Sequence, residues 1–190
     1  MNTLDHYIFK QNYLSKSFCE DLTKEIDQMQ WEKHQWYGAT GKYHSEKEQV
    51  LDVLKTVQHP QLREKIVKPI VSAIKDYQKL HGQSDEDRTK EFIYTISPVR
   101  FNKYSSGTKM RKHFDHIRDL FDGNFKGIPI LSVVGVLNDN YEGGEFVFNN
   151  DYEVKLKQGD ILIFPSNFIY AHEVKEIKNG TRYSYVSWVF

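Results

Sequence analysis

The stretch that decides the fold is DILIFPSNFIYAHEVKEIKNGTRYSYVSWV, residues 160–189. Segments rich in Ile, Val, Tyr and Phe alternate here with Gly, Asn and Pro, the pattern of short strands separated by turns. Short strands at near-regular spacing favour a sandwich, a jelly roll or a barrel. The same pattern reaches back to residue 92, and it predicts strands over residues 92–104, 129–138, 144–149, 152–157, 160–164, 168–175 and 181–189.

The first half of the chain has a helical pattern instead. Apolar residues recur every three or four positions after Ser17, and the segment from Ser17 to Glu20 has the form of a capping box. Further helical stretches are predicted over residues 45–57 and 60–80, and Gly82 is the predicted stop of the last one. We therefore expect an α+β protein in which N-terminal helices pack on one face of the β unit.

Length and composition narrow the class of protein. The chain has 190 residues, with 26 Lys plus Arg balanced by 26 Asp plus Glu. This length suits one domain, residues 1–190, with residues 1–90 a mainly helical support region and residues 91–190 the β-rich core. A nucleic-acid binder usually has a basic excess, which is absent here.

The single cysteine, Cys19, cannot form an intramolecular disulfide. We expect it to be a partly buried packing residue. The N-terminal sequence has no apolar stretch of signal-peptide length, and no window has the roughly 18 apolar residues of a membrane span. The expected location is the cytoplasm, without a membrane partner.

The strongest chemical motif is His113-Phe-Asp115. In an extended segment, residues i and i+2 point to the same side, so this imidazole and carboxylate can reach one point. Two imidazoles and one carboxylate form the facial triad of non-haem Fe(II) sites, which leaves open positions for other ligands. His172 is the candidate second imidazole. Other histidines, including His6 and His34, are expected in surface or packing roles.

The C-terminal segment predicts a hairpin. Lys178-Asn179-Gly180 suits a three-residue hairpin loop, and the register then pairs Ile177 with Thr181. Arg182 would lie about 13 Å along the sheet from His172 at ~3.3 Å per residue, a span that a metal-bound diacid and an arginine could bridge. The residues predicted to share one face are His172, Val174, Arg182, Ser184, Val186 and Trp188.

Residues from about 98 to 190 resemble the Fe(II)- and 2-oxoglutarate-dependent oxygenases, in particular the prolyl 4-hydroxylase-like branch and its short, bacteriophage-encoded members. The resemblance implies a double-stranded β-helix, or jelly roll. It rests on an ordered set of motifs: Tyr104, Gly107, His113-x-Asp115, Leu137-Asn138-Asp139, Gly143-Gly144-Glu145, Gly159-Asp160, Phe164-Pro165-Ser166, His172, Arg182-x-Ser184 and Trp188.

The resemblance also implies roles for the matching residues. His113, Asp115 and His172 would be the iron ligands. Arg182 would bind the C5 carboxylate of 2-oxoglutarate, assisted by Ser184. The implied cofactors are Fe(II), 2-oxoglutarate as cosubstrate and O2, with ascorbate as a reductant.

Three further residues would border the active site. Tyr104 matches a strand tyrosine that contacts the cosubstrate, and Trp188 matches an aromatic at the edge of the site. Met110 departs from the pattern, because this branch often has Tyr at that position. We also expect the segments 105–112 and 116–127 to form mobile walls over the iron.

The implied reaction is hydroxylation of an unactivated C–H bond. Peptidyl proline is the expected substrate, and a free amino acid or small metabolite is the alternative. The basic residues Lys109, Arg111 and Lys112 near the iron motif could favour an acidic substrate, or they could form a solvated loop. A hypothesis of a different class is a non-catalytic jelly-roll module that only binds a sugar, a peptide or a metal.

Overall fold

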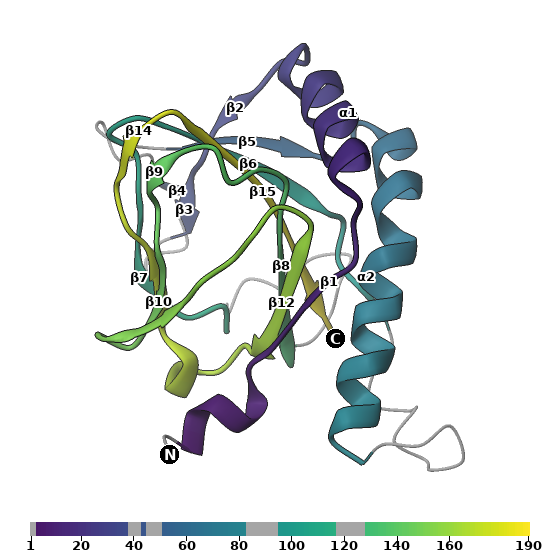
Figure 1. Cartoon of the computed structure of the whole chain (residues 1–190), viewed down its shortest axis with the longest axis vertical. Coiled ribbons are helices and arrows are strands. Elements are labelled where there is room, and N and C mark those ends of the chain that lie inside the picture. Colours follow the sequence, from purple (N-terminus) through teal and green to yellow (C-terminus); the bar gives the residue numbers. More distant parts are fainter. Residues whose placement is uncertain (1–2, 38–42, 45–50, 83–94, 117–127) are drawn as a thin grey trace.

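Two antiparallel sheets face each other in the computed structural model of the chain (Figure 1), which describes residues 3–37, 43–44, 51–82, 95–116 and 128–190. The large sheet contains, in spatial order, β1 (Phe9–Asn12), β12 (Asp160–Pro165), β8 (Leu131–Val136), β15 (Thr181–Val189), β6 (Arg100–Ser105), β5 (Asp52–Lys55) and β2 (Glu32–Lys33). The small sheet contains β11 (Tyr152–Val154), β10 (Phe146–Phe148), β13 (His172–Val174) and β7 (Met110–His113).

Short elements complete the fold. They are the 3-10 helices η1 (Thr3–Tyr7) and η4 (Phe168–Tyr170), the pair β3 (Trp36–Tyr37) and β4 (Tyr43–His44), and the pair β9 (Glu142–Gly143) and β14 (Ile177–Asn179). The mainly antiparallel β architecture predicted for the second half is confirmed. The predicted strand over 168–175 is divided between η4 and β13, and the one over 92–104 begins only at Arg100 within the described residues.

The two long helices lie outside the large sheet. Helix α1 (Lys16–Asp27) begins after Ser15, whose Oγ accepts a hydrogen bond from the Phe18 amide at 3.2 Å. The predicted cap at Ser17 is therefore wrong by two residues. Helix α2 (Pro60–Leu80) agrees with the predicted helix and continues through Pro69.

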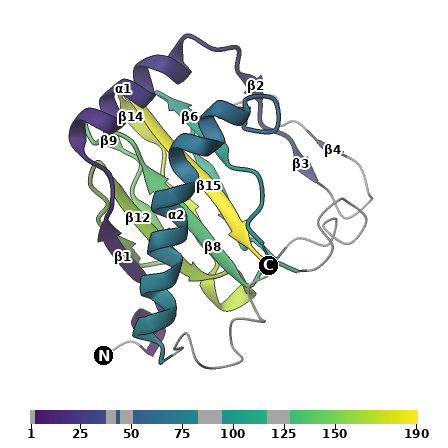
Figure 2. The ribbon, with the colours of Figure 1, turned by 90° about the vertical axis from the view of Figure 1, so that its right-hand side faces the viewer.

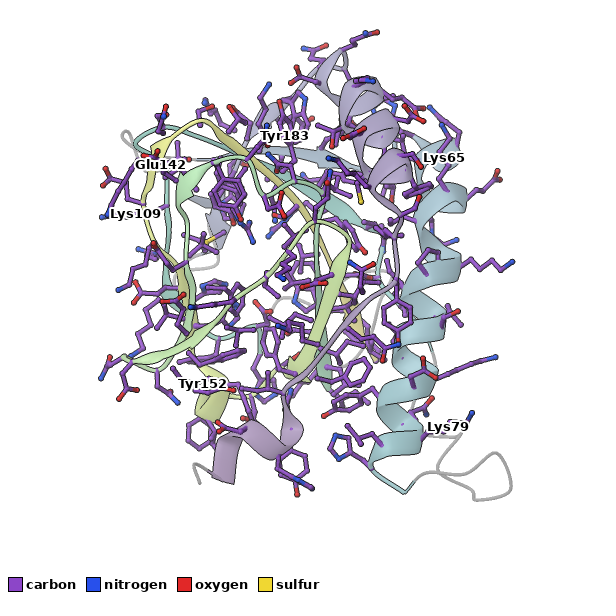
Figure 3. All side chains as sticks on the ribbon, in the orientation of Figure 1. Lys65, Lys79, Lys109, Glu142, Tyr152 and Tyr183 are labelled. Atoms are coloured by element: carbon purple, nitrogen blue, oxygen red, sulfur yellow. The ribbon has the colours of Figure 1, made fainter. Side chains whose placement is uncertain are left out.

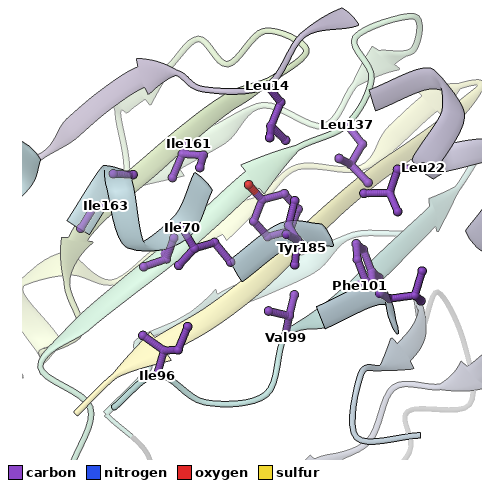
Figure 4. Packing of buried hydrophobic residues seen from close by; sticks show 14 of the residues in the cluster. Leu14, Leu22, Ile70, Ile96, Val99, Phe101, Leu137, Ile161, Ile163 and Tyr185 are labelled. Atoms are coloured by element: carbon purple, nitrogen blue, oxygen red, sulfur yellow. The ribbon is translucent and has the colours of Figure 1, made fainter. Parts of the chain in front are cut away.

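Both helices lie over the same face of the large sheet (Figure 2), and apolar side chains pack between the helices and the sheet (Figure 4). Leu22 from α1 and Ile70 from α2 join one buried cluster with Phe101 and Tyr185 of the sheet. Long charged side chains such as Lys65 lie on the outer side of this layer (Figure 3), where Lys65 pairs with Glu25 of α1. This helical layer leaves the opposite face of the large sheet free to meet the small sheet.

The helix predicted over residues 45–57 is wrong where the structure describes it. Residues 52–55 form strand β5, which pairs with β6, and residues 45–50 lie outside the described residues. Leu51 and Val53 pack between the sheets, whereas Leu54 packs beneath the helices. The segment is thus buried on both faces with the two-residue period of a strand.

The predicted C-terminal hairpin is also wrong. Strand β13 pairs with β10 and β7 in the small sheet, whereas β15 pairs with β6 and β8 in the large sheet. Between them the chain crosses from one sheet to the other through β14, which pairs with β9. His172 therefore pairs with His113 and Phe148, not with Val186.

The predicted packing role of Cys19 agrees with the structure, although this residue is fully rather than partly buried. It lies in the helical layer, and burial raises the pKa of its thiol to about 11. Gly143 and Gly144 adopt φ angles of 78° and 68°, the left-handed region that favours glycine. Within the described residues no helix combines the length and the apolarity needed to cross a membrane.

Gly135 should tolerate no side chain. A Cβ atom at this β8 position would lie 1.9 Å from Cζ of the buried Tyr185 ring. We expect Gly135→Ala to lower the free energy of unfolding by about 2 kcal/mol, because overpacking shifts a closely packed core. Urea unfolding measures the effect, with the exposed Lys24→Ala as control. An unchanged midpoint for Gly135→Ala would contradict this packing.

His34 gives a prediction about pH. Burial, together with the charge of Arg100, lowers the pKa of His34 to about 3 from 6.5. Below pH 6.5 the unfolded chain therefore binds a proton that the folded chain does not, so stability decreases as the pH falls. The decrease between pH 6.5 and 4.5 should be roughly 2–3 kcal/mol from this group.

Urea unfolding at both pH values, compared between the wild type and His34→Gln, isolates the contribution of this imidazole. The variant should lose less stability on acidification than the wild type. An equal loss in both proteins would show that His34 is protonated in the folded state.

Candidate metal centre

The pairing of β7 with β13 brings two imidazoles together between the sheets. His113 ends β7, His172 begins β13, and the two residues pair directly, with ring centroids 4.5 Å apart. Asp115 follows two residues after His113, and its carboxylate lies 3.3 Å from His113 Nε2 and 3.9 Å from His172 Nε2. One potential ligand atom from each of these three residues lies within 4.8 Å of the others.

Backbone carbonyls orient both imidazoles. His113 Nδ1 lies 2.8 Å from the Arg111 carbonyl, and His172 Nδ1 lies 3.0 Å from the Tyr170 carbonyl. A carbonyl can only accept, so each Nδ1 carries a proton, and in a neutral imidazole of this tautomer the lone pair is on Nε2. Both Nε2 atoms point toward Asp115, as metal-binding histidines require.

The electrostatics of the cluster also suit a cation. Burial lowers the pKa of His172 to about 4, so its imidazole is neutral at pH 7. Burial by itself raises the pKa of Asp115, but the neighbouring imidazoles and the Ser132 hydroxyl outweigh it and hold that pKa below its usual range. The cluster thus offers two imidazole nitrogens and one carboxylate, the donor set of a non-haem Fe(II) facial triad.

A serine pair supports the carboxylate from behind. Ser132 Oγ donates to Asp115 Oδ2 at 2.6 Å and lies 2.9 Å from Ser166 Oγ. Both serines are buried. Ser166 belongs to a motif noted in the sequence, but neither serine could be given this role before the sheets were placed.

Arg182 lies in the same cavity and is only 1% exposed. Its Nη1 donates to Ser184 Oγ at 2.8 Å, its Nε donates to the Tyr141 hydroxyl at 3.2 Å, and its guanidinium lies 5.2 Å from the centre of the Tyr104 ring. None of the ion pairs among the described residues includes Arg182. A buried cation without a carboxylate partner is costly, and it suits an anionic ligand.

The remaining predicted site residues line this cavity as well. Tyr104, Met110 and Trp188 lie on its wall, with Met110 buried at the start of β7. The lining residues that the sequence analysis did not identify are Arg100, Asn102, Val134 and Phe146. Tyr141, which binds Arg182, was also missed, because its loop gives no strand periodicity to follow.

Alternation along β6 could have identified two of the missed residues. Arg100 and Asn102 precede Tyr104 at two-residue steps, and all three side chains line the cavity. Residues i, i+2 and i+4 of a strand share one face. A role for Tyr104 therefore implies that the Arg100 and Asn102 side chains also face the metal cluster.

The predicted wall over residues 105–112 is tied to the rest of the fold. The Gly107 amide donates to the Ile177 carbonyl at 2.8 Å, and the Ile177 amide donates to the Thr108 carbonyl at 2.9 Å. Of the second predicted wall, 116–127, only His116 lies within the described residues. Whether these segments move on binding stays a prediction.

Residues 99–190 match the family model described as "2OG-Fe(II) oxygenase superfamily". Among sequence relatives, a PKHD-type hydroxylase of Stenotrophomonas maltophilia is 34% identical over 97 residues, which are 48% of this chain and 42% of the relative. A PKHD-type hydroxylase of Prochlorococcus marinus is 46% identical over 89 residues, 45% of this chain and 39% of the relative. The matches thus span less than half the length of these relatives.

Solved structures share the fold over nearly the whole chain. A prolyl hydroxylase from Trichoplax adhaerens, in complex with a hypoxia inducible factor peptide fragment, has a TM-score of 0.71 at 18% identity and covers 100% of this chain and 86% of its own. The viral collagen prolyl hydroxylase of Paramecium Bursaria Chlorella virus-1 has a TM-score of 0.61 at 18% identity, and the match covers 99% of this chain and 98% of the viral chain. Residues 99–190, about half of this chain, thus match the 2OG-Fe(II) oxygenase superfamily in sequence, and the solved prolyl hydroxylase structures share the fold of nearly the whole chain.

Proposed function

We propose that this chain is an Fe(II)- and 2-oxoglutarate-dependent dioxygenase that hydroxylates an unactivated C–H bond of its substrate, with residues 1–190 acting as one domain. The observation that carries the proposal is the position of a His–Asp–His cluster, with Asp115 and His172 buried and His113 partly buried, in the same cavity as an arginine without a carboxylate partner. A cavity with both a set of metal ligands and an arginine suits a cosubstrate that binds the metal at one end and presents a carboxylate to the arginine at the other.

The metal would be held by His113, Asp115 and His172. When bound, Fe(II) with 2-oxoglutarate and O2 supplies the oxidative chemistry. The two Nε2 atoms and one carboxylate oxygen would be the protein ligands of the metal, and a facial triad of this kind leaves further coordination positions for other ligands. The Ser132 hydroxyl fixes one carboxylate oxygen of Asp115 and so sets the angle at which the other approaches the metal.

Arg182 would bind the far carboxylate of 2-oxoglutarate. Its planar fork can donate two parallel hydrogen bonds to a carboxylate. Ser184 and Tyr141 already hold the guanidinium in place, so little side-chain freedom remains to be lost on binding. Tyr104, whose ring lies under this guanidinium, would complete the cosubstrate wall.

An aromatic wall keeps water from the metal side of the cavity. The Phe146 ring stacks on the His172 ring at 5.1 Å between centroids, and the Phe164 ring meets its edge at 4.9 Å. All three residues are buried. Exclusion of water strengthens the electrostatic interactions within the site and limits side reactions.

Peptidyl proline is the substrate that the relatives favour. The Trichoplax neighbour is a prolyl hydroxylase bound to a peptide, and the viral neighbour is a collagen prolyl hydroxylase. A free amino acid or small metabolite is the second candidate. A non-catalytic module that binds only a sugar or a peptide would not explain a His–Asp–His cluster beside an arginine that lacks a carboxylate partner.

Loss of any one metal ligand should abolish turnover. We expect His113→Ala, Asp115→Ala and His172→Ala each to weaken Fe(II) binding and to stop succinate formation, because two remaining donors hold the metal poorly. Anaerobic Fe(II) titration with 2-oxoglutarate, followed by visible charge-transfer absorbance, measures binding. The exposed His6→Ala is the matched control. Full activity in all three variants would exclude this triad, and wild-type protein without metal binding or succinate would favour the binding module.

Arg182 should control cosubstrate binding without controlling metal binding. At 2-oxoglutarate one hundredfold above its Kd, binding should stabilise the metal-loaded wild type by about 2.7 kcal/mol. We expect Arg182→Met to lose most of this stabilisation but to keep its affinity for the metal. Thermal unfolding with and without 2-oxoglutarate makes the comparison, with the exposed Arg63→Met as control. Collapse of metal binding with intact 2-oxoglutarate binding would contradict this role.

A further inference from the structure

A second arginine lines the cavity and has no role in the chemistry described so far. Arg100 opens β6, its Nε donates to Asn102 Oδ1 at 3.1 Å, and its guanidinium lies 5.2 Å from the centre of the Trp188 ring. None of the ion pairs among the described residues includes Arg100. Its two terminal NH2 groups have no hydrogen-bond partner within the same part of the chain.

The neighbouring Trp188 leaves a second donor unused. Its indole Nε1 is buried and has no hydrogen-bond partner in the described parts of the chain. An indole N–H can only donate, and a buried donor normally has an acceptor. Arg100 and Trp188 thus form a contact on the cavity wall, and both residues carry N–H donors without a hydrogen-bond partner among the described residues.

The strand register places Arg100 and Trp188 away from Arg182. Arg100 pairs with Val186, whereas Tyr104 pairs with Arg182, four residues earlier on β15. The two arginine backbones therefore lie roughly 13 Å apart along the sheet. Trp188 pairs with Ser132, the serine that holds Asp115, so the Arg100–Trp188 pair lies at the metal end of the cavity.

A charge count shows which ligand would suit this end. The two charges of Fe(II) and the one of Arg182 balance the carboxylate of Asp115 and both carboxylates of 2-oxoglutarate. The charge of Arg100 then remains without a counterion in a largely desolvated cavity. Burial opposes this charge and lowers the pKa of Arg100, but a guanidinium stays protonated in proteins. One further anionic group would neutralise it.

We propose that Arg100 and Trp188 form a carboxylate-binding site for the substrate, beside the carbon that is hydroxylated. The substrate would therefore be an acid: either a free amino acid bound through its α-carboxylate, or a peptide with an Asp or Glu side chain next to the target residue. This inference rests on the proposed function, because it assigns the substrate of the same site.

Exposed positive charge at the nearby sheet edge agrees with such a substrate. Lys109 and Arg111 are exposed beside the metal ligand His113 and add to the local positive field. Fields of this kind raise the rate at which anions reach a site. Lys112 is exposed as well, and its Nζ donates a hydrogen bond to Asn150 Oδ1 at 2.6 Å.

The Trp188 indole can report binding without turnover. The chain has three tryptophans, so 15N-labelled indoles should give three signals, and Trp188→Phe identifies one of them. The protein is loaded with Zn(II) in place of Fe(II), together with 2-oxoglutarate. Two matched pairs of probes are titrated: L-proline against L-prolinamide, and acetyl-Pro-Asp-amide against acetyl-Pro-Asn-amide.

We expect the acid of at least one pair to shift the Trp188 signal and to bind at least tenfold more tightly than its amide. A preference for proline identifies a free amino acid as the substrate class, and a preference for the aspartyl peptide identifies an acidic peptide. Arg100→Gln should abolish the preference, Arg100→Lys should keep part of it, and the exposed Arg63→Gln should keep all of it.

Several results would overturn the inference. These are equal binding of acid and amide in both pairs, no shift of the Trp188 signal by either acid, or an acid preference that survives in Arg100→Gln. A 2-oxoglutarate Kd raised in Arg100→Gln as much as in Arg182→Met would assign Arg100 to the cosubstrate instead. If wild-type protein forms the Fe(II)–2-oxoglutarate complex but shows no acid preference, only this inference fails; if the complex does not form, the proposed function fails.

Discussion

The antiparallel pairing of β7 with β13 is the interaction on which the candidate site depends. It sets the His113 and His172 rings 4.5 Å apart, and the chain then needs only two more residues to bring Asp115 to both imidazoles. Each Nδ1 atom donates to the carbonyl two residues earlier in the chain, that of Arg111 in β7 for His113 and that of Tyr170 in η4 for His172. Pairing therefore fixes both the positions of the imidazoles and the nitrogens that they present, before any metal binds.

The residues of the site could be predicted from the sequence more reliably than the strand pairing could. The hairpin expected between His172 and Arg182 does not exist, because β13 and β15 belong to different sheets. The residues assigned to one face nevertheless line one cavity, since the two-residue alternation of a strand decides which side chains face the interior. Partner choice depends on contacts distant in sequence, and local periodicity carries no information about it.

The features that escaped prediction share a physical cause. Strand β5 was mistaken for a helix because both of its faces are buried, which removes the clear alternation of a half-exposed strand. Arg100, Ser132 and Tyr141 are polar residues that acquire a role only when a second sheet covers them. A polar residue in a strand normally indicates a solvent-facing position. Its role in a site can therefore be assigned only when the fold is known.

The two apolar clusters have different roles, because one stabilises the sheet from outside and the other surrounds the candidate site. One cluster joins α1 and α2 to the outer face of the large sheet, and the other fills the space between the sheets around the candidate site. Arg182 and Arg100 bring charge into this second space without carboxylate partners, which opposes folding. Apolar burial in the helical layer offsets that penalty from the opposite face of the same strands. The cavity can therefore hold unpaired cations that suit anionic ligands, because the stability of the sheet does not depend on its inner face alone.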